Sequence, residues 1–177
     1  MNEIIKEYGG GLYALAAEEH LEEGLLSEIR LLRDFLTPDY VRLLIHPAVP
    51  KEERVGLVSQ LLDGRVHPYL SSFVKLMTER SLAAEIVGCF GEYERLYYEA
   101  FAIVRVRAES AAPLNDGQKQ KLENKLTTST GHRVEIAYEV NPSLLGGMRL
   151  MFDNRQIDDS VRTRLREISD RLAGVVL

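Results

Sequence analysis

Apolar residues recur at intervals of three and four through the first hundred positions, which is the period of one face of a helix. The pattern is clearest at Ile86, Phe90, Tyr93 and Tyr97. It predicts six consecutive helices, over residues 3–20, 25–36, 39–46, 50–63, 68–80 and 86–104. Because the connections are short and no strand pattern interrupts them, we expect an N-terminal six-helix bundle.

Near residue 104 the apolar period changes to two, which is typical of a half-buried strand. Val104, Val106 and Ala108 alternate there with charged residues. Two more alternating runs cover residues 134–140 and 148–152, and the second turns at Asp153-Asn154 into Gln156-Ile157. The sequence therefore predicts three strands in its second part.

Two further helices accompany these strands. Asn115, with Gln118 three residues later, marks a helix start between the first two strands. A last apolar stripe at helical spacing runs over residues 161–175. Residues 106–177 are therefore predicted to form a β-α-β-β-α domain after a helical domain of residues 1–105. The fold class is mainly α with a small α+β part.

The helix predicted over residues 68–80 has more apolar surface than a bundle helix needs. Such a helix usually buries one apolar stripe. This one carries two stripes, Leu70, Val74 and Met77, and Tyr69, Phe73 and Leu76. The first helix contains glycines at positions 9–11, which let another backbone approach closely. If these two helices are neighbours, they form an apolar groove floored by glycine, which suits an amphipathic partner helix. The alternative is that the glycines break the first helix and both stripes belong to the core.

Composition and charge narrow the classes of protein that fit. Hydrophobic residues make up 45% and charged residues 28% of the 177 residues, which is typical of a globular chain. The single cysteine excludes a disulfide framework and a multi-cysteine zinc site. Residues 1–105 carry 11 Lys and Arg against 17 Asp and Glu, whereas residues 106–177 carry 11 against 10. Because phosphates need clustered cations, we expect no binding of nucleic acid by this acidic first part.

The sequence also indicates where in the cell the protein is expected. No apolar run approaches the ~20 residues that cross a membrane. The first seven residues contain two acids and no apolar core segment, unlike a secretory signal. We therefore expect no direct membrane insertion and a reducing, cytoplasmic setting.

Residue types that perform catalysis are present, but not in catalytic spacing. None of the four histidines lies four residues from another, as a metal-binding helix requires. Cys89 adjoins the apolar seam of the sixth helix, which favours a packed, inert thiol. Gly146-Gly147 lacks the Lys-Ser/Thr of a phosphate-binding loop and is better explained as a tight turn. Asp158 and Asp159 precede the last helix, where carboxylates cap free N–H groups, so we expect no catalytic residue, metal or cofactor.

Five short motifs follow one another in a recognisable order. The strongest are Asn141-Pro142-Ser143-Leu144-Leu145-Gly146-Gly147 and Ile157-Asp158-Asp159-Ser160-Val161-Arg162. The others are Ser110-Ala111-Ala112-Pro113-Leu114, Phe73-Val74-Lys75-Leu76-Met77 with Glu79-Arg80, and Tyr8 with Leu12-Tyr13. Over nearly the whole chain this order resembles the delta subunit of the F-type ATP synthase, whose mitochondrial relative is the oligomycin-sensitivity-conferring protein. Asn141 replaces the usual Asp, Asp159 stands where Gly or Ala is common, and the glycines at 9–11 replace an alanine-rich stretch.

The resemblance implies a non-catalytic stator subunit, present as one copy in a hetero-oligomeric complex at the cytoplasmic face of the bacterial cell membrane. In that family the helical domain, here residues 1–105, clasps the N-terminal helix of an alpha subunit of the catalytic head. The C-terminal domain, here residues 106–177, binds the peripheral-stalk b subunits. Such a subunit couples rotor torque to ATP synthesis.

The resemblance also implies site residues, carried over by their positions in the helices. The alpha-subunit helix is expected to contact Tyr8, Gly11, Leu12, Phe73, Leu76 and Arg80. The structural motif of the C-terminal domain corresponds to Pro142, Gly146, Gly147, Asp158 and Ser160.

Two other classes of protein remain open. One is a cytoplasmic helical adaptor of an unrelated assembly, which would not bind an alpha-subunit peptide. The other is a small hydrolase that uses Asp158, Asp159 and His132, and it requires these side chains to converge in one pocket.

Overall fold

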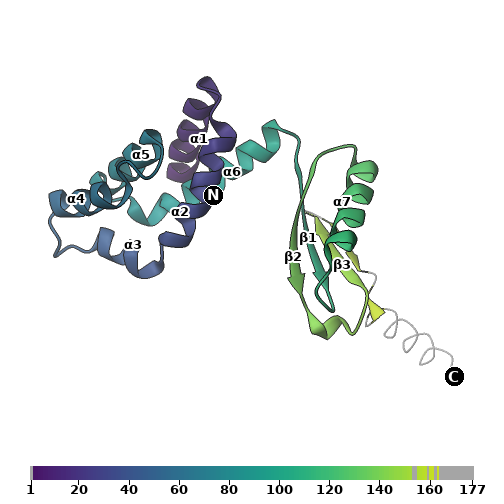
Figure 1. Cartoon of the computed structure of the whole chain (residues 1–177). Helices are drawn as coiled ribbons and strands as arrows, with labels where there is room; N and C mark the ends of the chain where they lie inside the picture. The colour runs from purple at the N-terminus through teal and green to yellow at the C-terminus, as the bar shows by residue number, and fades with distance from the viewer. Residues whose placement is uncertain (1, 153–154, 159, 162, 164–177) are drawn as a thin grey trace. The chain divides into compact units, whose positions relative to one another are not determined.

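The computed structural model describes residues 2–152, 155–158, 160, 161 and 163 (Figure 1). The chain divides into two compact units, Met1–Glu99 and Ala100–Leu177. The division thus falls after Glu99, earlier than the expected boundary between residues 105 and 106. Because strand β1 begins at Val104, the residues just before 106 belong to the second unit.

Six α-helices occupy the six predicted places in the first part of the chain. They are α1 (Glu3–Glu18), α2 (Glu22–Phe35), α3 (Pro38–Ile45), α4 (Lys51–Leu62), α5 (Pro68–Glu79) and α6 (Ile86–Ala100), with a 3-10 turn η1 (Ala83–Glu85) before α6. Their ends follow the local chemistry: the Thr37 side chain caps α3 by accepting the Tyr40 N–H, and Gly64 follows α4 with a φ of +74°. Within the described residues, no helix is long and apolar enough to cross a membrane.

The core of the first unit is built from the predicted apolar stripes. In α6, Ile86, Phe90 and Tyr93 have no exposed surface. The hydroxyl of Tyr93 donates a hydrogen bond of 3.0 Å to the carbonyl oxygen of Glu22, where α2 begins. From α2 and α5, the core receives Leu25, Ile29, Leu70, Val74 and Met77. Burial of these side chains is the main source of the unit's stability.

Two glycines allow α1 and α6 to approach closely. A Cβ added at Gly9 would lie 2.6 Å from the backbone oxygen of Cys89, so no side chain fits there. Reciprocally, the space beside Gly88 is filled by Ile5, whose Cδ1 would lie 2.5 Å from a Cβ at Gly88. Since α1 is continuous from Glu3 to Glu18, the alternative that the glycines break this helix is wrong.

The second unit contains a four-stranded mixed sheet in the order β2-β1-β3-β4. Its elements are β1 (Val104–Ser110), α7 (Asp116–Thr130), β2 (Val134–Val140), a 3-10 turn η2 (Pro142–Leu144), β3 (Met148–Phe152) and β4 (Arg155–Asp158). Strand β1 pairs with β2 in parallel and with β3 in antiparallel orientation, and β4 is antiparallel to β3. The parallel pair requires a crossover connection, and α7 provides it.

The second unit contains a fourth strand, β4, that the predicted β-α-β-β-α order lacks. The sequence indicated three strands, with a turn leading into Gln156-Ile157, whereas residues 155–158 form a fourth strand along β3. This strand has only four residues, too few to show a period of two. The last predicted helix, over residues 161–175, lies outside the described residues except for Val161 and Thr163.

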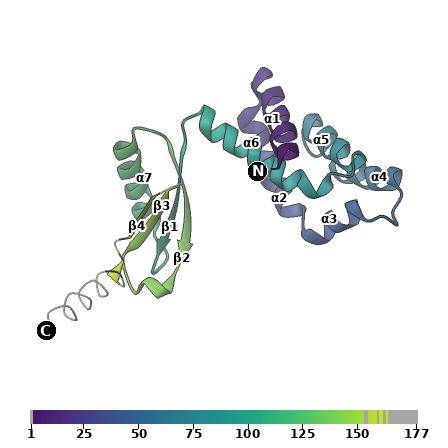
Figure 2. The ribbon, with the colours of Figure 1, turned by 180° about the vertical axis from the view of Figure 1, so that it is seen from behind.

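Helix α7 covers one face of the sheet (Figure 2). Its start is the predicted capping box, in which Asn115 and Gln118 each accept the other's backbone N–H. The small core beneath it contains Val106, Leu126 and Val134, with Val104, Leu122, Ile136, Leu150 and Phe152 packed against them. Leu122 and Leu126 come from α7 itself, and the others are the alternating apolar positions of the predicted strands.

We expect Gly9→Ala to lower the free energy of unfolding by about 1–3 kcal/mol, which is typical of overpacking. The obstructing atom is a backbone oxygen, so the new methyl group can be accommodated only by moving a helix. Gly10→Ala is the matched control, because its nearest neighbour, Leu96 Cδ1, is 3.9 Å away. In a helix, alanine is favoured over glycine by about 1 kcal/mol, so this variant should be at least as stable as the wild type. Urea unfolding of both variants measures the difference, and equal effects would contradict the α1–α6 contact.

Candidate functional site

An apolar groove runs between α1 and α5, and we call it the α1–α5 groove. Its volume is about 480 Å³. The lining residues from α1 are Glu7, Tyr8, Gly11, Leu12 and Leu15, and those from α5 and its end are Tyr69, Ser72, Phe73, Leu76 and Arg80. All six residues expected to contact the alpha-subunit helix are therefore brought together in one place.

The two walls of the groove run in opposite directions. Tyr8, near the start of α1, accepts a hydrogen bond of 3.0 Å from Nη1 of Arg80, which follows α5. Leu15, near the end of α1, lines the groove together with Tyr69 at the beginning of α5. The groove thus follows several turns of both helices, and a groove of this kind suits the apolar face of a third helix.

The floor of the groove is buried, and its rim is open. Leu12 is 4% and Phe73 is 7% exposed, whereas Leu15 and Leu76 are 38% and 37% exposed. The Phe73 ring also packs against the core ring of Phe90, with centroids 5.9 Å apart. The two stripes of α5 thus have different roles, so the alternative that both belong wholly to the core is wrong.

Gly11 contributes to the groove by lacking a side chain. A Cβ at this position would meet no atom within 4 Å, so the space beside it is open. The groove is therefore not floored by glycine: Gly11 lines it at an exposed position, Gly9 faces Cys89 of α6, and the buried floor is made by Leu12 and Phe73. A glycine at this position lowers the stability of the helix, but it leaves the groove wider than a larger residue would.

Four lining residues were not among those expected to contact the alpha-subunit helix: Glu7, Leu15, Tyr69 and Ser72. Leu15 and Tyr69 belong to apolar stripes that the periodicity does identify. Nothing in the local sequence distinguishes Glu7 or Ser72 from other polar residues on a solvated helix face.

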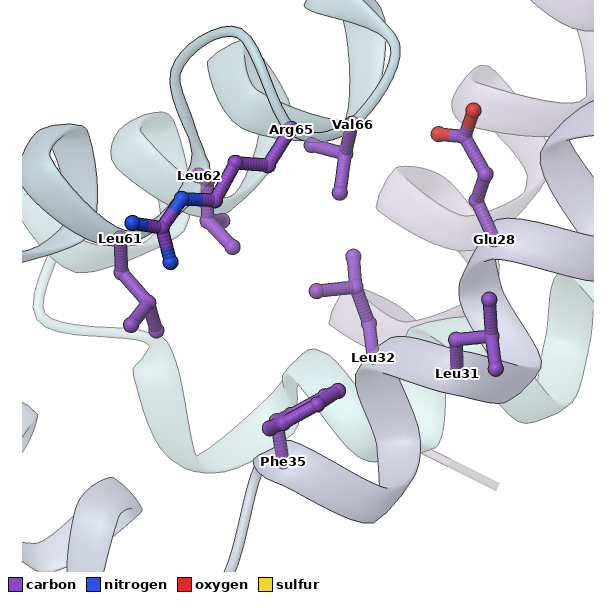
Figure 3. A pocket seen from close by; sticks show the side chains of 8 residues that line it. All are labelled: Glu28, Leu31, Leu32, Phe35, Leu61, Leu62, Arg65 and Val66. Carbon is purple, nitrogen blue, oxygen red and sulfur yellow. The ribbon is translucent and has the colours of Figure 1, made fainter.

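A second apolar hollow lies between α2 and the end of α4 (Figure 3). Its volume is about 260 Å³, which is smaller than that of the α1–α5 groove. Leu31 and Phe35 stand one helical turn apart at its edge and are 64% and 67% exposed. Glu28 and Arg65 lie on opposite sides of it, and Figure 3 shows the Arg65 side chain extended along Leu61 and Leu62.

The glycine motif of the second unit forms a turn between η2 and β3. Pro142 is the first residue of η2, and Gly147 has a φ of +76°, a conformation that favours glycine. A Cβ at Gly146 would lie 2.9 Å from Cγ2 of Val161, and the carbonyl oxygen of Gly146 accepts the Val161 N–H at 2.9 Å. The motif therefore holds the chain that follows β4 against the turn before β3.

Asp158 at the end of β4 is a structural carboxylate. Its Oδ2 accepts a hydrogen bond of 2.9 Å from Nε of Arg149, and its Oδ1 accepts the backbone N–H of Ser160 at 3.0 Å. Hydrogen bonds from Ser160, followed in importance by the one from Arg149, hold the pKa of Asp158 well below its usual range. The capping group of the next turn is the buried Ser160 hydroxyl, which accepts the Thr163 N–H at 3.3 Å. Asp159, the other expected cap, lies outside the described residues.

Two of the residues proposed for a hydrolase, His132 and Asp158, do not converge, and the third, Asp159, lies outside the described residues. His132 precedes β2 and Asp158 ends β4, and these strands are the two opposite edges of the sheet. Cys89 is fully buried, which raises its pKa to about 11, so the thiol is inert as predicted. Among the described residues, no three His, Cys, Asp or Glu side chains are grouped to hold a metal ion.

Known proteins resemble this chain along nearly its whole length. Residues 4–172 match the family described as ATP synthase delta (OSCP) subunit. The ATP synthase subunit delta of Symbiobacterium thermophilum is 31% identical over 172 residues, which cover 96% of this chain and 92% of the relative. That of Gloeothece citriformis is 30% identical over 176 residues, covering 98% and 96%. A chain of the Toxoplasma gondii mitochondrial ATP synthase hexamer has the same fold, with a TM-score of 0.73 at 15% identity, covering 97% of this chain and 98% of that one.

These matches define the class of protein as a subunit of a rotary ATP synthase. Within this class, the chain belongs to the ATP synthase delta (OSCP) subunit family. The family resemblance seen in the motifs is thereby confirmed, and the adaptor of an unrelated assembly is not favoured.

Asp158→Asn should destabilise the second unit by about 1.5–3 kcal/mol at neutral pH, the range for hydrogen bonds to charged groups. Because the pKa of Asp158 is lowered in the folded chain, this contribution is complete above about pH 4, the ordinary aspartate value. It is lost as the pH falls through the lower pKa of the folded state. Hydrogen exchange of β3 amides reports on this unit. A difference between variant and wild type that stays constant down to low pH would contradict the assignment.

Proposed function

We propose that this chain is the non-catalytic stator subunit that joins the catalytic head of an F-type ATP synthase to the peripheral-stalk b subunits. Rotor torque acts on the head, and the stalk must hold the head still for that torque to drive ATP synthesis. The subunit transmits the holding force and leaves nucleotide chemistry and proton flow to other subunits. Membership of the ATP synthase delta family supports this role.

Within this role, the α1–α5 groove receives the N-terminal helix of one alpha subunit. The observation that carries this assignment is that six residues, chosen by their positions along the sequence, line a single groove: Tyr8, Gly11, Leu12, Phe73, Leu76 and Arg80. The groove has an apolar floor, an open apolar rim and two antiparallel walls, which suit the apolar face of an amphipathic helix.

Apolar burial supplies the persistence that a stator contact needs. Each Å² of apolar surface removed from water contributes about 25 cal/mol before the cost of association. Leu15 and Leu76 at the rim still expose more than a third of their surface, so a docked helix has apolar area to cover. A contact of this kind depends little on salt, unlike one held by exposed charges.

The second unit binds the b subunits in this proposal, and one copy of the chain serves each complex. The assembly lies at the cytoplasmic face of the bacterial cell membrane. The chain attaches there through its partners. The compact second unit, with its own core beneath α7, supports a separate binding role for each unit.

Leu76→Glu should leave the chain folded and weaken capture of the alpha-subunit N-terminal peptide by at least about a hundredfold, because docking would bury an unpaired charge. The Leu76 side chain is 37% exposed, so the free chain tolerates the change. Calorimetric titration with the ~20-residue peptide from the same organism measures binding. One-to-one binding by the wild type with a negative heat-capacity change indicates apolar burial.

Leu31→Glu is the matched control, since it makes the same change in the second hollow at a side chain that is 64% exposed. We expect it to bind the peptide like the wild type. Loss of binding in Leu31→Glu but not in Leu76→Glu would contradict the groove assignment and indicate that the peptide binds in the second hollow. If the folded wild type fails to bind the peptide at all, the proposed function is wrong.

A further inference from the structure

The charged residues that line the α1–α5 groove lie at one end of it. Glu7 stands on the α1 wall, next to Tyr8, and Arg80 follows α5 and reaches Tyr8 with a hydrogen bond of 3.0 Å. The other end is lined by Leu15 and Tyr69. The groove therefore has a charged end and a neutral end, with an acid and a base on opposite walls of the charged end.

Neither charge is neutralised within the described part of the chain. No carboxylate there forms an ion pair with Arg80, whose side chain has Tyr8 as its hydrogen-bond acceptor. Glu7 likewise has no cationic partner among these residues. Several other cations of this unit form ion pairs: Lys75, for example, pairs with Asp63 at 2.7 Å.

Helix dipoles explain only part of this arrangement. Arg80 is the C-cap residue of α5, where a cation is favoured by the partial negative charge of the helix end. Glu7 lies in the second turn of α1, beyond the first turn in which the dipole acts strongly. Helix dipoles and ion pairs within the chain therefore do not explain why Glu7 stands opposite Arg80 in the groove.

We infer that these two residues set the direction of the docked helix, an inference that rests on the proposed function of the groove. The docked helix presents an acidic side chain to Arg80 on its α5 flank. It presents a basic side chain to Glu7 on its α1 flank, at the same end of the groove. A helix docked in reverse places both side chains at the neutral end, and each faces the opposite wall. The charges thus distinguish one direction from the other, while the apolar floor supplies affinity in both.

The expected effect is moderate, because exposed ion pairs contribute little. Each pair corresponds to about a two- to fivefold change in Kd. Reversing one charge replaces attraction by repulsion, so Arg80→Glu should weaken binding of the alpha-subunit N-terminal peptide about five- to tenfold. Arg80→Gln keeps a donor for Tyr8 and loses the charge, so its effect should be about half as large on a logarithmic scale.

Charge-reversal rescue tests the inference. The peptide is prepared with each of its acidic residues changed to Lys in turn, and each version is titrated against wild type, Arg80→Glu and Arg65→Glu. One of these peptides should bind Arg80→Glu better than wild type, whereas the unmodified peptide shows the opposite preference. Arg65→Glu is the matched control, since it makes the same change in net charge at the second hollow and should behave like the wild type.

The outcomes separate the inference from the proposed function. If the unmodified peptide binds Arg80→Glu and wild type equally, or if no peptide rescues Arg80→Glu, the groove does not set direction through Arg80, and the groove assignment still stands. If Arg65→Glu weakens binding as much as Arg80→Glu does, net charge and not position is responsible, which also overturns the inference. Absence of binding to the folded wild type overturns both.

Discussion

The contact between α1 and α6 determines what the helical unit can present to a partner. Gly9 lies against the backbone oxygen of Cys89, and Gly88 leaves room for Ile5, so each helix provides a glycine where the other approaches. A larger side chain at Gly9 would push α1 away from α6 and move Tyr8 and the other residues of the α1 wall with it. The shape of the groove thus depends on two positions that do not line it.

The groove also shares residues with the core of the unit. Leu12 and Phe73 form its floor and are buried already in the free chain, and Phe73 packs on Phe90 of α6. In the proposed function, a force on the docked helix passes directly into these core side chains. Close-packed interiors deform little, so a floor made of core residues transmits load better than a flexible surface loop would.

Much of this arrangement could be predicted from the sequence, because helix periodicity and capping signals are local. Each predicted helix of the first unit exists, and Asn115 with Gln118 forms the expected capping box. Strand β4 was missed, since four residues after a turn carry no period. The different roles of Gly9 and Gly11 could not be predicted either. Each role depends on which helix packs against that glycine, and this is determined by the tertiary structure.

Tertiary contacts also explain the two family motifs of the second unit, the one that contains Gly146 and the one that contains Asp158 and Ser160. Strand β4 is a short edge strand, paired on one side only, and Arg149 of β3 links it to the sheet by binding Asp158 at 2.9 Å and Glu109 of β1 at 3.3 Å. Arg149 is 25% exposed, and bridging two carboxylates makes it more stabilising than an isolated surface pair. Asp158 then fixes the Ser160 N–H, while Gly146 accepts the N–H of the next residue. Gly146 of one motif and the Asp158–Ser160 segment of the other thus act together to set the path of the chain after β4.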